Sequence, residues 1–432
     1  MKKRWVVCGL IIMIVSLLGC KQLARTEQAV PGSEALWSVQ SEVRNKVVVV
    51  SDLHFGIDDR YSETIENRKV FITFLERLGA MSDVSELVLA GDFLDDWYLP
   101  LTYPAYTDSD AFYRQVIQTN QEVFDGLQAL LDKGIRVTYV PGNHDMLLES
   151  AVLQEALPGI NQARDARGLG AYVTGLRDEI VIEHGHRYDV FSAPEHIANK
   201  DLTVGVDSML PPGYFYARFA ASWVLQGKPL IKKDYPTITQ VPDPKSNSDQ
   251  FGAYLYYRIW NSELGNRITP FERFEDKVLE MQHNGYNGNY SIADFYPVVQ
   301  RDGTISAPTL FRNFQRTWDK NQEINLVEHK TSFIESVAGT LDGDYFFKQA
   351  KKQYLLNPEK KVDVVVFGHT HRPGLEKLPD YDGKYYVNSG TWIDHNTYHP
   401  GASTFVVITS SETVDTAQLY EYYKDGTVTL LK

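Results

Sequence analysis

Five short apolar runs along the chain each lead into polar residues. The runs are rich in β-branched side chains and are bounded by polar positions, which is typical of strands buried on both faces of a sheet. Between the early runs, residues 64–78 and 111–131 carry apolar side chains at helical spacing. Strands that alternate with helices predict an α/β fold with a largely parallel sheet. The five runs are residues 46–50, 86–90, 136–140, 179–182 and 362–367.

The chain returns to strand-like runs near its C-terminal end. We expect these later runs to complete a second sheet. Asp425 and Gly426 form a turn signal that predicts a hairpin between the last two runs. The four runs are residues 384–388, 404–408, 418–423 and 427–431.

Each of the first five runs is followed by a cluster of Asp, His or Asn. Ligands of open α/β sheets bind beyond the carboxyl ends of the strands, so we expect the clusters to lie together. Carboxylates, imidazoles and an amide, without a thiolate, suit Mn, Fe or Zn rather than a Cys-rich structural zinc site. Two such ions can promote displacement at phosphorus. The clusters are Ser51–His54, Gly91–Asp95, Gly142–Asp145, His184–His186 and Gly368–His371.

The ordered set of clusters resembles the calcineurin-like metallophosphoesterases. Their pattern is D-x-H, G-D-x-x-D, G-N-H-[DE], a later His and G-H-x-H, and all five parts occur here between residues 52 and 371. The resemblance implies a four-layer α/β/β/α sandwich. It also implies hydrolysis of a phosphomonoester, phosphodiester or pyrophosphate by two divalent metal ions, with a bridging hydroxide as the nucleophile.

The resemblance further implies seven metal ligands. Three would bind the first ion, three would bind the second, and one carboxylate would bridge both. Four glycines within the clusters (91, 142, 185 and 368) are expected where a Cβ would interfere with a sharp backbone turn. The ligands of the first ion would be Asp52, His54 and His371, the bridging residue Asp92, and the ligands of the second ion Asn143, His184 and His369.

Two more residues would be catalytic. In the family, the residue at the position of His144 faces the phosphate and assists the leaving group, and Asp95 would orient it. A His–Asp pair is also what general-acid assistance requires. The neighbouring residues His186, Asp189 and Asp145 fit a positioning or capping role as well as they fit substrate contact.

The segment Gly91–Trp97 is similar to the branch that contains the UDP-2,3-diacylglucosamine hydrolases, which cleave a pyrophosphate. This similarity covers few residues and indicates a relative rather than a substrate. An alternative from another class is a non-catalytic surface lipoprotein with a structural metal site that binds a glycan or a protein. The presence of His144 and Asp95 disfavours that alternative, because a structural site needs no assisting His.

The N-terminus predicts the location of this chemistry. Basic residues 2–4 precede an apolar run, residues 5–18, that is too short to span a bilayer comfortably and is typical of a signal peptide. The run ends in Leu17–Cys20, which resembles a bacterial lipobox and implies cleavage before a lipid-anchored Cys20. Lys21 then favours the outer membrane or cell surface in a cell with two membranes. The chain's other cysteine, Cys8, lies in the segment that would be removed.

The net charge of −13 disfavours a nucleic-acid partner, because phosphate backbones are bound through Lys and Arg. Small phosphorylated substrates remain compatible, because two divalent ions would dominate the local field.

A long stretch separates His184 from His369, where the family core needs only a few strands and turns. A loop of that length without its own elements would be unusual, so we expect a large, mostly helical insertion. Its aromatic residues either form a cap that selects the substrate or form the insertion's own core. The predicted division is a signal peptide (1–19), a lipid anchor and tether (20–44), a metallophosphoesterase core (45–190 and 356–432) and an inserted cap region (191–355).

Overall fold

The computed structural model describes residues 36–37, 41, 43–203, 205, 208–229, 238–264, 273–297, 299–300, 302–306, 308–340, 342–381 and 383–432. The predicted signal peptide, Cys20 and most of the tether lie outside these residues. Among the residues described, no helix is both long enough and apolar enough to cross a bilayer.

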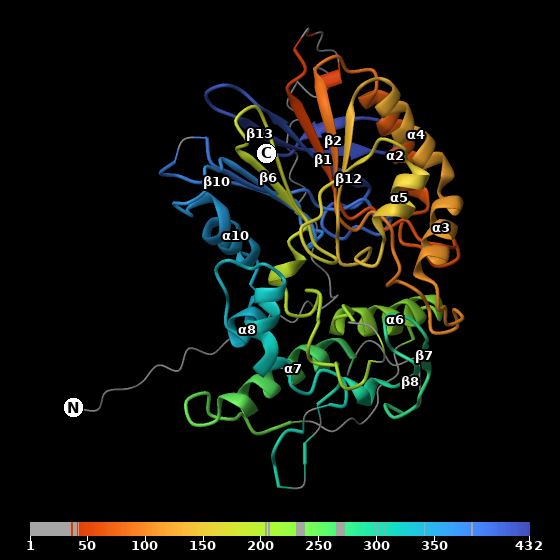
Figure 1. Cartoon of the computed structure of the whole chain (residues 1–432), viewed down its shortest axis with the longest axis vertical. Helices are drawn as coiled ribbons and strands as arrows, with labels where there is room; N and C mark the ends of the chain where they lie inside the picture. Colours follow the sequence, from red (N-terminus) through yellow and green to blue (C-terminus); the bar gives the residue numbers. More distant parts are fainter. Residues whose placement is uncertain are drawn as a thin grey trace, which may run out of the picture.

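Two large mixed sheets form the upper part of the molecule as drawn in Figure 1, within the described residues. The larger has the strand order β14-β13-β12-β1-β2-β3-β4 and the smaller β10-β11-β9-β6-β5. The strands of the larger sheet are β1 (Lys46–Val50), β2 (Val84–Ala90), β3 (Arg136–Val140), β4 (Asn161–Gln162), β12 (Ala402–Thr409), β13 (Thr416–Tyr423) and β14 (Val428–Leu430). Those of the smaller are β5 (Ala171–Thr174), β6 (Ile180–Glu183), β9 (Val364–Phe367), β10 (Gly374–Lys377) and β11 (Tyr385–Asn388).

The two faces of β1 show why the sheets stack. Val47 and Val49 pack with Ile182 and Val364 of the smaller sheet in a buried cluster between the sheets. Val48 and the other alternate residues pack against helices on the outer face. Because successive side chains of a strand point to opposite faces, an apolar strand of this kind needs a partner on each side. This confirms the predicted four-layer arrangement.

Helices cover the two outer faces of the stacked sheets. Four helices pack on the larger sheet, on the right of Figure 1, and a short helix followed by a π-helical turn packs on the smaller sheet. The former are α2 (Glu66–Leu78), α3 (Ser109–Thr119), α4 (Gln121–Asp132) and α5 (Ser150–Ala156), and the latter are α10 (Tyr345–Ala350) and η3 (Lys351–Leu355).

The structure corrects the expected places of the later strands. Only β11 joins the second sheet, whereas β12, β13 and β14 extend the first sheet, in which β12 pairs antiparallel with β1. The first sheet is therefore mixed rather than largely parallel. The hairpin at Asp425 and Gly426 does connect β13 and β14, which pair antiparallel. The reason is that strand patterning encodes burial, while the choice of a pairing partner depends on which sheet edge is free.

The predicted helical stretch 111–131 is two helices. The first ends and the second begins at Asn120, whose side-chain amide donates to the carbonyl oxygens of Gly56 (3.0 Å) and Val116 (2.8 Å). Asn competes with the helical backbone for such hydrogen bonds, which favours a break at this position.

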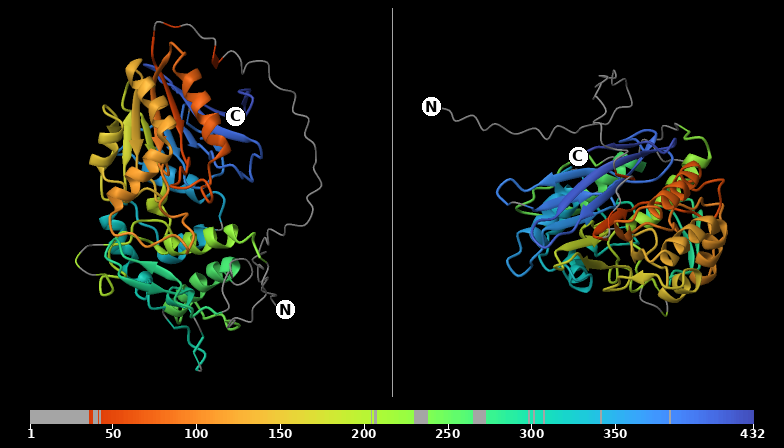
Figure 2. Two further views of the ribbon diagram at one scale, coloured as in Figure 1. Left: turned by 90° about the vertical axis from the view of Figure 1, so that its right-hand side faces the viewer. Right: turned by 90° about the horizontal axis from the view of Figure 1, so that it is seen from above.

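Most of the region predicted as an insertion forms a lobe below the two sheets in Figure 1, coloured green to cyan, and the side view of Figure 2 shows the same arrangement. Its last elements, α10 and η3, instead pack on the smaller sheet. Many of its aromatic rings, among them Tyr214, Phe215 and Trp260, are buried in a cluster continuous with the helix-covered face of the larger sheet. This burial fits the interpretation that they form the insertion's own core. The cap role stays a prediction. The elements here are α6 (Pro212–Leu225), α7 (Ser248–Leu264), β7 (Leu279–Met281), β8 (Gly288–Tyr290), η2 (Ile292–Asp294), α8 (Phe314–Ile324) and α9 (Phe333–Gly339), and η1 (His186–Tyr188) precedes the region.

Candidate metal centre

The five polar clusters meet beyond the carboxyl ends of five strands. β1, β2 and β3 are parallel neighbours in the larger sheet, and β6 and β9 are parallel neighbours in the smaller sheet. The carboxyl ends of parallel neighbouring strands lie on the same side of a sheet. Stacking of the two sheets brings the carboxyl ends of β1, β2 and β3 close to those of β6 and β9. The first residues so positioned are Asp52 after β1, Asp92 after β2, Asn143 after β3, His184 after β6 and His369 after β9.

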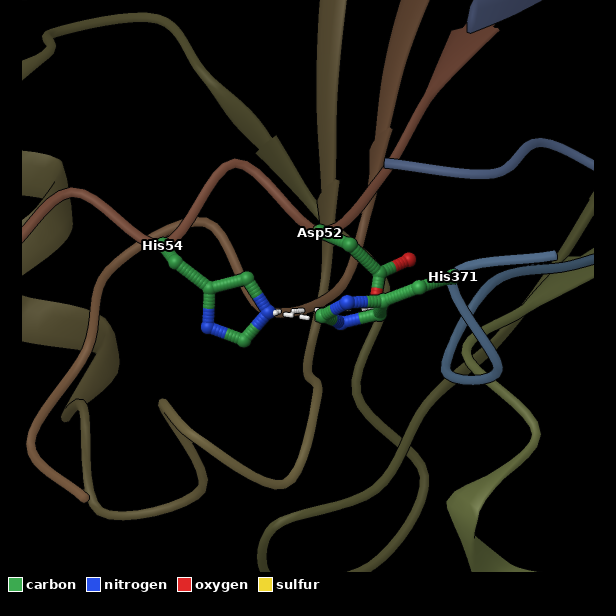
Figure 3. A group of neighbouring side chains, drawn as sticks. All are labelled: Asp52, His54 and His371. Carbon is green, nitrogen blue, oxygen red and sulfur yellow. Dashed lines mark hydrogen bonds and ion pairs between the residues drawn. The ribbon is translucent and has the colours of Figure 1, made fainter. Parts of the chain in front are cut away.

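Asp52, His54 and His371 form one group of potential ligands (Figure 3). Nε2 of His54 lies 3.1 Å from Nε2 of His371, and Nε2 of His371 lies 3.2 Å from Oδ1 of Asp52. Burial opposes the ionisation of Asp52, but His184 and His371 outweigh it, so the pKa of Asp52 is lowered. The group therefore presents an ionised carboxylate and two imidazole nitrogens at close range.

Asp92, His184 and His369 form a second group. Nε2 of His184 lies 3.1 Å from Oδ2 of Asp92 and 3.1 Å from Oδ1 of Asn143. The same Asp92 oxygen lies 3.7 Å from Nε2 of His54, so this carboxylate stands between the two groups. On the other side of the ring, Nδ1 of His184 lies 2.9 Å from the carbonyl oxygen of Ala90, which leaves Nε2 for a metal.

The two groups fit two divalent ions. Nitrogen and oxygen ligands about 2.0–2.2 Å from one ion lie about 3 Å from each other, and the contacts of 3.1–3.2 Å between the candidate atoms match this spacing. The donors are imidazoles, carboxylates and one amide, as Mn, Fe or Zn prefer. The structure thus brings together all seven residues predicted as ligands, and their individual roles stay predictions.

The backbone at this centre is unusual. Asp52, His54, Asp92, His369 and His371 all have positive φ, between 46° and 69°. Few residues other than glycine adopt this left-handed conformation, and residues held in it concentrate at functional sites. The ligand positions therefore carry backbone strain that the surrounding strands must hold, a feature that the sequence motifs do not reveal.

The four glycines of the clusters serve two purposes. Gly91 and Gly185 have φ of +88° and +100°, the left-handed region that glycine adopts readily. Gly142 and Gly368 instead allow close approach: a Cβ on Gly142 would lie 2.1 Å from the backbone nitrogen of Asp92. The expected interference with a Cβ is thus present at all four.

His144 lies beside the first group of ligands and is held by two neighbours. Its Nδ1 is 2.9 Å from Oδ2 of Asp95, as predicted for an orienting carboxylate, and its ring stacks on Trp97 at 4.6 Å. Burial disfavours the charged imidazole, but Asp95 and Asp92 outweigh it and raise the pKa of His144 to about 10. The pair therefore favours a protonated His144.

The structure gives positions to the neighbouring residues whose roles were open. Oδ2 of Asp189 lies 3.0 Å from Nε2 of His369, which orients that ring. Asp145 accepts hydrogen bonds from the backbone nitrogens of Gly142 (2.6 Å) and Phe93 (2.8 Å), so it joins two ligand loops. His186 is buried, with Nε2 2.9 Å from the carbonyl oxygen of Gly168.

Sequence reasoning missed Glu63. Its Oε2 lies 3.8 Å from Nδ1 of His54 and its Oε1 lies 3.1 Å from Nε2 of His395. Glu63 belongs to no motif, and only the fold brings the segment before α2 against the first ligand group. His395 and His399 belong to none of the ligand groups found among the described residues.

Comparisons with known proteins agree with this site. The family model of calcineurin-like phosphoesterases matches residues 45–259. A probable cyclic nucleotide phosphodiesterase of Fibrobacter succinogenes is 34% identical over 102 residues, which cover 24% of this chain and 31% of that protein. The chain thus spans about a third of that relative's length.

Two solved structures illustrate the distant likeness. Vps29 of Entamoeba histolytica in complex with Zn²⁺ is 12% identical, with a TM-score of 0.28 over 89% of this chain and 96% of that chain. A dimetal phosphatase of Danio rerio is 12% identical, with a TM-score of 0.30 over 91% and 99%. Likeness at this level says nothing of the substrate. The similarity of Gly91–Trp97 to the UDP-2,3-diacylglucosamine hydrolases stays a prediction.

The family match and the buried cluster of His and Asp side chains agree on one class of protein. The chain belongs to the calcineurin-like phosphoesterase family.

Proposed function

We propose that this chain hydrolyses esters of small phosphorylated molecules at a dinuclear metal centre. The observation that carries the proposal is that Asp92 of the second ligand group also faces His54 of the first, while the His144–Asp95 pair adjoins the first group. Two bound divalent ions, Mn, Fe or Zn, would supply an activated water and neutralise charge that develops at phosphorus. A structural metal site would have no use for the assisting pair.

The chain's own residues divide the remaining work. Asp95 holds Nδ1 of His144, which leaves Nε2 to give a proton to the departing oxygen. Asp95, which is not a predicted metal ligand, raises the pKa of His144 and so favours the protonated form that a general acid needs. Trp97 covers one face of the ring and so limits its orientation.

The proposal also covers the type of phosphate ester that is hydrolysed and the place of the protein in the cell. A relative named as a probable cyclic nucleotide phosphodiesterase supports a diester substrate, within the 102 residues that match. The lipobox-like Leu17–Cys20 supports attachment of Cys20 to the bacterial envelope through a lipid.

The test is hydrolysis of p-nitrophenyl phosphate and bis-p-nitrophenyl phosphate by the chain from residue 21, with added Mn²⁺ or after chelation. We expect turnover that requires metal and is lost in Asp92→Ala and in Asn143→Ala, with a matching loss of bound metal. Asn289→Ala, at an exposed position of β8, is the control and should behave as the wild type. Equal turnover with and without chelator would overturn the proposal.

A further inference from the structure

A cavity of about 440 Å³ opens beside the second ligand group. We call it the side pocket, and the residues that matter for its chemistry are Asp189, Asp342, Phe346, His369, Arg372 and Tyr398. Its volume falls in the range of roughly 300–1,000 Å³ that is usual for small-molecule sites. The residues predicted to bind the first ion do not line it.

The side pocket adjoins the second ligand group, whereas His144 adjoins the first. His144 contacts the ring of His54, with centroids 4.5 Å apart, and the side pocket is bounded by His369, whose ring packs on His184 at 5.3 Å. Asp92 stands between the two ligand groups, 3.7 Å from His54 and 3.1 Å from His184.

This arrangement separates the two ester groups of a phosphodiester. The group expelled from phosphorus must leave from the end where His144 can protonate it. The other ester group is retained on phosphorus and needs space to the side of the line between the attacking and leaving oxygens, and the side pocket provides space beside the second ligand group. A phosphomonoester has no such group and would leave the side pocket unused.

The walls of the side pocket indicate the chemistry of the retained group. Phe346, half-buried, packs its ring against that of His369 at 5.4 Å, and Tyr398 lies at the rim. Arg372 donates a hydrogen bond from Nε to the Tyr398 hydroxyl (2.6 Å), and its guanidinium lies over the Tyr398 ring, 5.1 Å from the centroid. Within the described part of the chain, Arg372 forms no ion pair with a carboxylate. Arg372 therefore keeps donors for a ligand.

The charge of the side pocket disfavours a strongly anionic ligand. Four carboxylates line it, from Asp189, Asp342, Asp344 and Glu376, against the guanidinium of Arg372 and two ammonium partners, Lys348 beside Asp342 and Lys432 beside Glu376. Such walls repel a second phosphate but accept hydrogen bonds from hydroxyl and amino groups. Aromatic rings, one guanidinium donor and several carboxylate acceptors suit a neutral, planar ring that carries a hydroxylated sugar.

We propose that the side pocket binds the retained nucleoside of a nucleoside phosphodiester. The inference rests on the proposed function and narrows its substrate class. The base lies among Phe346 and Tyr398, Arg372 donates to an acceptor of the base, and the carboxylate of Asp344 accepts from a sugar hydroxyl.

The test compares three substrates that share one leaving group: p-nitrophenyl phosphate, methyl p-nitrophenyl phosphate and the p-nitrophenyl ester of thymidine 5′-phosphate. The wild type should turn over the nucleoside diester with a kcat/KM about tenfold or more above that of the methyl diester, as one charged hydrogen bond and ring contact would give. Arg372→Ala and Tyr398→Ala should each abolish most of that preference. Neither change should alter kcat/KM for p-nitrophenyl phosphate more than about twofold.

A binding measurement supplements the kinetics. Calorimetric titration with thymidine 5′-monophosphate should show binding to the wild type that Arg372→Ala weakens about tenfold. Arg114→Ala is the matched control, because Arg114 is a half-exposed arginine of α3 that pairs with Glu155 and lines no part of the side pocket.

The outcomes separate the two proposals. No metal-dependent turnover of any of the three substrates would overturn both the proposed function and this inference. Turnover without a preference for the nucleoside diester, or a preference that survives both substitutions, would overturn the inference alone.

Discussion

Oδ2 of Asp95 lies 2.9 Å from Nδ1 of His144. The same oxygen lies 2.9 Å from Nδ1 of His54, and the other oxygen accepts from the backbone nitrogens of Trp97 and Tyr98, each at 2.8 Å. One carboxylate therefore positions the proposed general acid and a predicted ligand of the first ion. Substitutions of Asp95 and of His144 should consequently have different effects.

His144→Ala should lower kcat about 10²–10⁴-fold while the bound metal stays near the wild-type amount, because His144 assists the leaving group but is not a predicted ligand. Steady-state kinetics together with elemental analysis of the purified protein checks this. A loss of metal equal to the loss of activity would contradict the assigned role.

Asp95→Asn should impair both functions, since the amide cannot serve as the charged partner of two imidazoles. We expect a fall in kcat and, in addition, about 10–100-fold weaker binding of the ion held by His54. Metal titration of the apoprotein gives the affinity. If Asp95→Asn lowered only kcat, its contact with His54 would have no bearing on metal binding.

Asp189→Asn should weaken the binding of the second metal ion, because Asp189 orients the ring of the predicted ligand His369 through its Nε2. A decrease in metal affinity of about 10–100-fold is expected for one of the two ions. Calorimetric titration with Mn²⁺ resolves it, with Asp132→Asn at an exposed position of α4 as the control. Unchanged affinities for both ions would show that His369 needs no such support.

Gly142→Ala should disrupt the centre through the backbone. The added methyl group would lie 2.1 Å from the nitrogen and 2.2 Å from Oδ1 of Asp92, so the loops must separate, at a cost of about 1–3 kcal/mol in the free energy of unfolding. Gly288→Ala is the matched control, because its Cβ would meet only the Tyr290 hydroxyl, at 4.0 Å. Urea unfolding and metal content compare the two, and equal behaviour would contradict the close approach.

The buried carboxyl group of Glu195, in the inserted region, should make the free energy of unfolding depend on pH. Burial raises its pKa to about 7, although Ala198 and Ile197 donate their backbone nitrogens to its carboxylate and so lower it. The folded protein therefore keeps a proton that the unfolded chain releases above its ordinary pKa of 4.5. The stability that this proton provides is present below pH 4.5 and is lost as the pH rises toward 7.

Glu195→Gln should remove this dependence. The variant should match the wild type near pH 5 and exceed it at pH 8 by up to about 3 kcal/mol in the free energy of unfolding. Urea unfolding at the two pH values measures the difference, with Glu122→Gln on the exposed face of α4 as the control. A gain of the same size at both pH values would mean that Glu195 does not titrate in this range.

The metal centre could be predicted because each motif directly follows an apolar run that is recognisable as a buried strand. The apolar side chains of residues 46–50, for example, indicate a buried strand, and the residues that follow must then lie beyond its carboxyl end. The pattern therefore predicted the α/β class and the meeting of the polar clusters, whereas the four-layer sandwich and the seven ligands were implied by the family resemblance. The pairing of Asp95 with His144 was likewise implied by the resemblance, and the structure shows the two residues after neighbouring strands, β2 and β3.

Only the tertiary structure decided which strands pair and what surrounds the ligands. The runs after residue 400 look alike as strands, and their place beside β1 depends on a free edge that no local pattern records. Glu63 reaches the first ligand group from outside every motif, and Asp189 contacts His369, 180 positions away in the chain. Local sequence encodes conformation and burial because these depend on neighbouring residues, whereas contacts between distant segments depend on how the whole chain packs.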